Sequence, residues 1–184
     1  MVIGILGLLL TSCAVLHEEY FYPQATGSIV EKKWCRGNVG VDSQLLFKMD
    51  AVDVEFEVWE YKGITRLGVS FRVYDGGTAV WPSQVVIVYA GSNKQELNAE
   101  SFKRLRRVSG TNQLWEKEYL VGSVMDRRNK EEFETYYETF VLAEEPIEEV
   151  KIEEVQVSIN GEKKVLSDLS FIKKSGFFLH PLNC

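Results

Sequence analysis

Apolar and polar residues alternate strictly along two neighbouring segments in the middle of the chain. In residues 52–59 (VDVEFEVW) and 66–74 (RLGVSFRVY), apolar side chains recur at every second position. This period of two is typical of a β-strand with one buried and one solvated face. If Lys62-Gly63 is a two-residue turn, the two segments pair with their apolar side chains on a shared face. The pattern therefore predicts a β-hairpin.

The same register predicts the side chains on the other face of this hairpin. Asp53 lies beside Arg72 and Trp59 beside Arg66, so we expect an ion pair and a cation–π pair there. Tyr61 extends this face, and sugar-binding β-sandwiches use aromatic rings beside hydrogen-bonding groups. Trp, Tyr and Arg are equally the residues that dominate protein interfaces. Trp59, Tyr61, Arg66 and Arg72 are therefore candidate binding residues, and cover by another part of the chain is the alternative.

The remaining apolar segments predict further strands at 84–90, 114–121, 133–142, 169–172 and 176–179. Residues 95–108 have apolar side chains spaced for one face of a short helix. Around Asn160-Gly161 we expect a hairpin with a three-residue loop and a bulge, because that register pairs Val157 with Val165. At least seven short strands and at most one helix predict an all-β fold, an antiparallel immunoglobulin-like β-sandwich.

The first ten residues, MVIGILGLLL, are apolar and uncharged. Their length is typical of a signal-peptide core and falls short of the roughly 20 residues that span a bilayer. The run leads into Leu10-Thr11-Ser12-Cys13, which resembles the lipobox of bacterial lipoproteins. The resemblance implies cleavage after Ser12 and lipidation of the Cys13 thiol, although no Lys or Arg precedes Ser12. A buried amino-terminal strand with an incidental cysteine is the alternative.

The lipobox implies a division of the chain into a signal peptide (1–12), a lipidated tether (13–26) and a single β-sandwich domain (27–184). By the sorting rule of enterobacterial lipoproteins, Ala14 after Cys13 implies an outer-membrane location facing the periplasm. Together with its strand content, the chain is similar to small β-sandwich lipoproteins of Gram-negative cell envelopes.

Cysteine usage is consistent with this location. With Cys13 lipidated, two of the three cysteines remain, Cys35 and Cys184. An oxidising periplasm favours one disulfide between them, which would add about 4–5 kcal/mol on the chain-entropy model. Two unpaired thiols are the alternative.

The net charge and the absence of certain motifs argue against several classes of function. The net charge of -6 over 184 residues argues against sequence-independent nucleic-acid binding, which needs a positive surface. The two histidines, His17 and His180, give no metal-site spacing, and no Gly-rich phosphate loop occurs. Ser170 and Lys173 form a Ser-x-x-Lys pair without the partner motifs of penicillin-binding enzymes. Clustered carboxylates such as Asp53, Glu55 and Glu57 are typical of a solvated strand face.

These observations predict a non-enzymatic protein without a cofactor. We expect an interaction or assembly accessory of the envelope, held at the membrane by a lipid on Cys13 and contacting an envelope protein. The alternative is a module that binds carbohydrate or envelope glycan through Trp59 and Tyr61.

Overall fold

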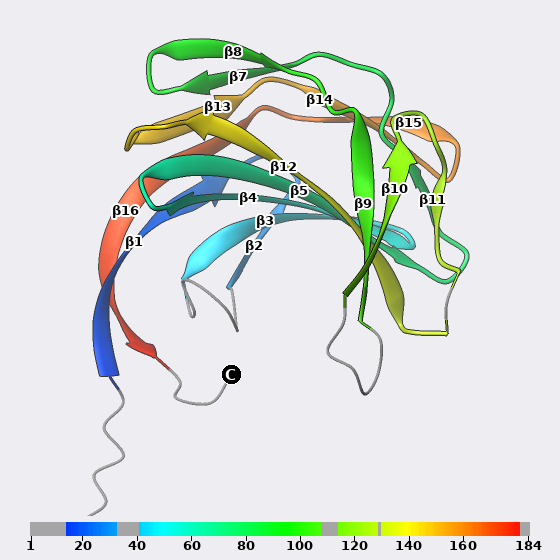
Figure 1. The fold of residues 1–184 in the computed structure, drawn as a ribbon, viewed down its shortest axis with the longest axis horizontal. Helices are drawn as coiled ribbons and strands as arrows, with labels where there is room; N and C mark the ends of the chain where they lie inside the picture. The colour runs from blue at the N-terminus through cyan, green and yellow to red at the C-terminus, as the bar shows by residue number, and fades with distance from the viewer. Residues whose placement is uncertain (1–13, 33–40, 108–113, 129, 181–184) are drawn as a thin grey trace, which may run out of the picture.

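The computed structural model describes residues 14–32, 41–107, 114–128 and 130–180 (Figure 1). Within these residues the chain forms strands and no helix. The strands are β1 (Ala14–Gln24), β2 (Ile29–Lys32), β3 (Asp42–Met49), β4 (Val52–Tyr61), β5 (Ile64–Tyr74), β6 (Thr78–Val80), β7 (Val86–Ala90), β8 (Asn93–Leu97), β9 (Ser101–Arg107), β10 (Leu114–Leu120), β11 (Met125–Asp126), β12 (Phe133–Ala143), β13 (Glu149–Ile152), β14 (Val155–Ile159), β15 (Glu162–Leu166) and β16 (Leu169–His180).

All strand pairs are antiparallel, so the expected all-β antiparallel fold is confirmed. The strands form three sheets, with the orders β1-β16-β13-β7-β8, β10-β9-β12-β5-β4-β3-β2 and β11-β6-β14-β15. Figure 1 shows β8, β7 and β13 of the five-stranded sheet above β12, β5 and β4 of the seven-stranded sheet, with β16 and β1 at the left. The described residues contain no helix able to cross a bilayer.

The hydrophobic core lies between these sheets. The seven-stranded sheet contributes Phe56 and Phe71, and the five-stranded sheet contributes Val150 and Phe171, all of them fully buried. Met125 adds a side chain from the four-stranded sheet to the same cluster. Each of the three sheets therefore contributes buried side chains to one core.

The central hairpin has the predicted register. Val52 pairs with Val73, Phe56 with Val69 and Trp59 with Arg66. Both turn residues, Lys62 and Gly63, have positive φ angles of 54° and 75°. Two left-handed residues match the twist of the flanking strands, which is why this turn closes without a bulge.

The short helix expected over residues 95–108 is wrong, because β8 and β9 occupy that segment. β8 pairs with β7, and β9 lies between β10 and β12. Phe102 enters the core with 1% of its surface exposed. The apolar spacing is compatible with a helix, but pairing with distant strands satisfies the backbone and buries Phe102.

The three-residue loop expected at Asn160-Gly161 is also wrong. Val157 pairs with Lys164 and Ile159 with Glu162, which leaves a strict two-residue turn. Asn160 and Gly161 have φ angles of 51° and 82°, as a type I′ turn requires. Asn160 Oδ1 also accepts a 2.8 Å hydrogen bond from the Thr78 backbone N–H, which joins the turn to β6. The preference of Asn160-Gly161 for a two-residue turn therefore sets the register of this hairpin, although the other register would pair Val157 with Val165.

The segment expected to be a tether is a strand instead. Residues 14–24 form β1, and each of them pairs with a residue of β16, from Ala14 with His180 to Gln24 with Ser170. Phe21 anchors β1 in the core with 1% exposure. The final strand pair expected at 169–172 and 176–179 is one continuous strand, β16. Cys13, Cys35 and Cys184 lie outside the described residues, so lipidation and the disulfide stay predictions.

Candidate functional site

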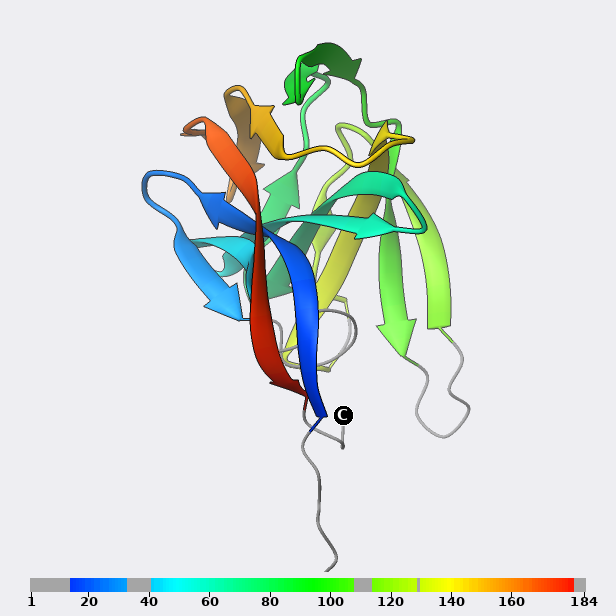
Figure 2. The same cartoon turned by 90° about the vertical axis from the view of Figure 1, so that its left-hand side faces the viewer.

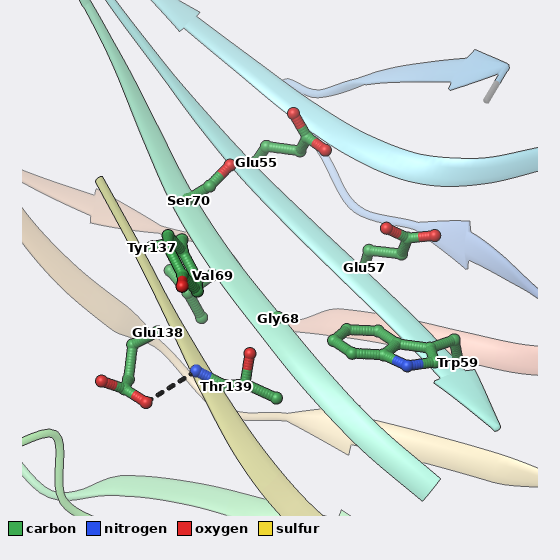
Figure 3. Close-up of a pocket in the computed structure, with 9 residues that line it drawn as sticks. All are labelled: Glu55, Glu57, Trp59, Gly68, Val69, Ser70, Tyr137, Glu138 and Thr139. Carbon is green, nitrogen blue, oxygen red and sulfur yellow. Dashed lines mark hydrogen bonds between the residues drawn. The ribbon is translucent and has the colours of Figure 1, made fainter. Parts of the chain in front are cut away.

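An open groove crosses the outer face of the seven-stranded sheet at β4, β5 and β12. It has a volume of about 190 Å³. The groove is lined by Glu55, Glu57 and Trp59 from β4, Gly68, Val69 and Ser70 from β5, and Tyr137, Glu138 and Thr139 from β12 (Figure 3). The alternation of the strands places Glu55, Glu57 and Trp59 on the face opposite the buried Phe56 and Val58.

A glycine forms the floor of this groove. Gly68 lies between Glu57 on one neighbouring strand and Thr139 on the other. The indole of Trp59 leans from β4 toward Gly68, as Figure 3 shows. A Cβ atom on Gly68 would stand 2.8 Å from Cζ3 of Trp59, which is too close for any real contact. The absence of a side chain at Gly68 therefore allows the half-buried indole to lie across the sheet.

Carboxylates make one end of the groove polar. Glu55 accepts a 2.7 Å hydrogen bond from Gln44 Nε2 and forms an ion pair with Arg72. The expected ion pair between Asp53 and Arg72 is wrong, because Arg72 reaches diagonally to Glu55. Asp53 instead accepts a 2.9 Å hydrogen bond from the Tyr74 hydroxyl. Burial and this hydrogen bond raise the pKa of Tyr74, which stays a neutral donor.

The structure brings together part of the predicted set of binding residues. Trp59 lines the groove, and Arg72 adjoins it through Glu55. Tyr61 stands at the hairpin end with 59% exposure, and Lys62 Nζ lies 5.2 Å from its ring centre. Arg66 pairs in register with Trp59 but does not line the groove. The expected cation–π contact between them does not form, because the indole is turned toward Gly68.

Sequence reasoning missed the floor and the far wall of the groove. Gly68, Ser70, Tyr137 and Thr139 belong to the site and were not predicted for it. The only signal was Gly68, an isolated glycine in the middle of an alternating strand. Such a glycine marks a bulge or a close approach by another group, and here the group is the indole of Trp59.

Comparison of this chain with known protein families, curated proteins and solved structures finds no match. Its function therefore has to be argued from the geometry of the groove.

Two other features bear on chemistry. Ser170 and Lys173 are separated by three positions of β16, so their side chains lie on opposite faces of the strand. Lys173 Nζ lies 3.1 Å from both Glu19 and Glu60, in a structural ion-pair network. Across the described part of the chain, no group of three acidic, histidine or cysteine side chains could hold a metal ion. The groove on β4, β5 and β12 is therefore a better candidate for a functional site than Ser170 and Lys173.

The groove combines an aromatic platform with a polar surround. Trp59 supplies the flat ring, Ser70 and Thr139 supply hydroxyl groups, and Glu57 supplies a carboxylate. Closed small-molecule pockets are usually larger, roughly 300–1,000 Å³. An open groove of this smaller size suits one unit of a longer ligand that lies along the sheet.

Proposed function

We propose that this protein is a non-enzymatic glycan-binding module of the bacterial cell envelope, held at the outer membrane through a lipid on Cys13. The ligand stacks one sugar ring on Trp59 in the groove of β4, β5 and β12. The arrangement of Trp59 across Gly68 carries this proposal. The missing side chain at Gly68 leaves room for the benzene edge of the indole over β5, where the ring lines an open groove.

The polar groups of the groove favour neutral or amino sugars. Carboxylate oxygens accept hydrogen bonds from sugar hydroxyls and amide N–H groups. The groove is lined by the acidic residues Glu55, Glu57 and Glu138, of which Glu55 pairs with Arg72. An anionic sugar at the same position would meet like charge, which disfavours binding.

Gly68→Ala tests this proposal without removing any group that contacts the sugar. The new Cβ displaces the indole, so affinity for a β-linked N-acetylhexosamine tetrasaccharide should fall roughly tenfold, about 1.4 kcal/mol. The melting temperature should change little, because the preference of a strand for alanine over glycine offsets the displacement of the indole. Isothermal titration calorimetry on wild type and variant measures both affinities. Equal affinities, or no heat from wild type with neutral and amino-sugar oligosaccharides, would overturn the proposal.

A second candidate function is docking of an envelope protein on the row beside the groove. Val141, Arg66 and Trp59 lie next to one another across β12, β5 and β4, and Val141 is 47% exposed. Arginine and tryptophan side chains are enriched at the centres of protein interfaces. Cross-linked co-purification from envelopes, with Cys13→Ser as the unanchored control, separates the two. One protein enriched only with the anchored form supports this second candidate.

A further inference from the structure

The strands β1 and β16 extend beyond the sheet to which they belong. β16 pairs with β13 only from Leu169 to Ile172. From Lys173 to His180 its strand partner within the described chain is β1, over residues 14–21, and the Lys173 backbone N–H also donates to the carbonyl of Glu148. We call residues 14–21 and 173–180 the terminal ribbon. Figures 1 and 2 show blue β1 and red β16 side by side, extending downward along the molecule.

One face of the terminal ribbon changes from buried to exposed along its length. Phe21 lies in the core, and its register partner Lys173 bridges Glu19 and Glu60, with 3.1 Å from Nζ to each carboxylate. Beyond this ion-pair network, Phe177 is 76% exposed, the highest value among the exposed large hydrophobic side chains of the described residues. Its ring meets His17 edge-on, with the ring centres 5.1 Å apart. The apolar ring thus lies near the free end and points into solvent.

The opposite face of the ribbon also has a phenylalanine near its free end and polar or basic side chains further from it. Phe178, near the free end, contacts Tyr20 edge-on at 5.6 Å between ring centres. Further from the free end, Lys174 Nζ lies 3.7 Å from the ring centre of Tyr22. Both faces therefore carry phenylalanine near the end and tyrosine or lysine behind it. Aromatic side chains with tyrosine and lysine at the polar boundary are characteristic of residues at a membrane surface.

The position of the proposed lipid anchor indicates that a bilayer is the partner of the exposed end of the ribbon. β1 begins at Ala14, directly after Cys13, so a lipid on Cys13 would hold the free end of the ribbon at the bilayer. His17, the partner of Phe177, is three residues from Ala14, or about 10 Å along the strand. The polar layer on each side of a bilayer is roughly 5–8 Å deep. An upright ribbon would hold Phe177 just outside this layer, so its ring reaches the headgroups when the ribbon tilts toward the bilayer.

We infer that the terminal ribbon is a membrane-contacting element, tilted so that Phe177 contacts the lipid headgroups, with Phe178 nearer to the anchor and Tyr20 and Lys174 further from the bilayer. This inference rests on the proposed anchorage through Cys13. The ribbon then holds the domain against the membrane in a fixed orientation, because a hydrogen-bonded strand pair replaces a flexible tether.

Depth-dependent quenching tests the inference in the full-length protein. Cys35→Ser and Cys184→Ser leave Cys13 for lipidation, and Phe177→Cys or Ser175→Cys then takes a nitrobenzoxadiazole label. Val165→Cys, at a 58% exposed position of β15 in the four-stranded sheet, is the matched control. The lipidated protein is reconstituted into phosphatidylethanolamine and phosphatidylglycerol vesicles that contain dibrominated lipid. We expect a blue shift and strong quenching at position 177, weaker quenching at 175 and none at 165.

The outcomes separate the inference from the anchorage on which it rests. Mass spectrometry first shows whether Cys13 carries lipid, and an unmodified Cys13 would overturn both the anchorage and the inference. A lipidated protein without quenching at 177 would overturn the ribbon contact and leave the anchorage intact. Equal quenching at 177 and 165 would also overturn the inference, because it indicates adsorption without a preferred face.

Discussion

Trp59→Ala is expected to weaken glycan binding by about thirtyfold or more, the equivalent of roughly 2 kcal/mol at the centre of an interface. The indole is the largest flat side chain that lines the groove, and Gly68 beside it has no side chain. Its removal takes away the stacking platform and leaves the hydroxyls and carboxylates without a ring to orient the ligand. Isothermal titration calorimetry against the same oligosaccharide measures the change.

Tyr61→Ala is the matched control for this prediction. Tyr61 is an aromatic residue on the same face of β4, is 59% exposed and lies outside the groove. Its loss should leave the affinity unchanged. Similar losses in Trp59→Ala and Tyr61→Ala would contradict the placement of the ligand in the groove and favour the hairpin end instead.

Arg104→Met is expected to destabilise the protein by about 3–5 kcal/mol, because it strands a buried carboxylate. The Glu134 side chain has no exposed surface, and Arg104 Nε lies 3.3 Å from its Oε1. Its other oxygen, Oε2, accepts a 2.8 Å hydrogen bond from the Arg128 backbone N–H. One backbone hydrogen bond is a weak substitute for a charged partner. Chemical denaturation of wild type and variant measures the free energy of unfolding.

Two further variants show whether the ion pair is the cause. Lys103→Met changes the neighbouring residue of β9, whose side chain lies on the other face, and should alter stability by less than about 0.5 kcal/mol. The double variant Arg104→Met with Glu134→Leu should recover most of the lost stability, because the unpaired charge is gone. If Arg104→Met cost less than about 1 kcal/mol, the ion pair would not stabilise the fold in this way.

The parts of the fold predictable from sequence are those in which local signals agree. The β4–β5 hairpin has strict alternation and a Lys62-Gly63 turn suited to two left-handed residues, so its register follows from the pattern alone. β1 gave no such signal. Its strand conformation depends on pairing with β16, more than 140 residues later in the chain, and that partner is invisible to a local pattern.

The difference between local signals and long-range pairing also explains which residues of the groove could be predicted from the sequence. Trp59 was predictable because it continues the outward face of an alternating strand. Tyr137 and Thr139 were not, because β12 joins the site only through pairing with β5. The partner of Arg72 was missed for another reason. Its long side chain reaches diagonally to Glu55, while directly opposite it Asp53 is bound by Tyr74.

A two-dimensional NMR titration tests the central claim most directly. The indole N–H signal of Trp59 is assigned with Trp59→Phe, and β-linked N-acetylhexosamine tetrasaccharide is added to the wild-type protein. We predict saturable shifts of this signal and of the backbone amides of Gly68 and Thr139, with the amide of Tyr61 unmoved. Shifts confined to other surfaces, or none at millimolar ligand, would contradict a glycan site in the groove.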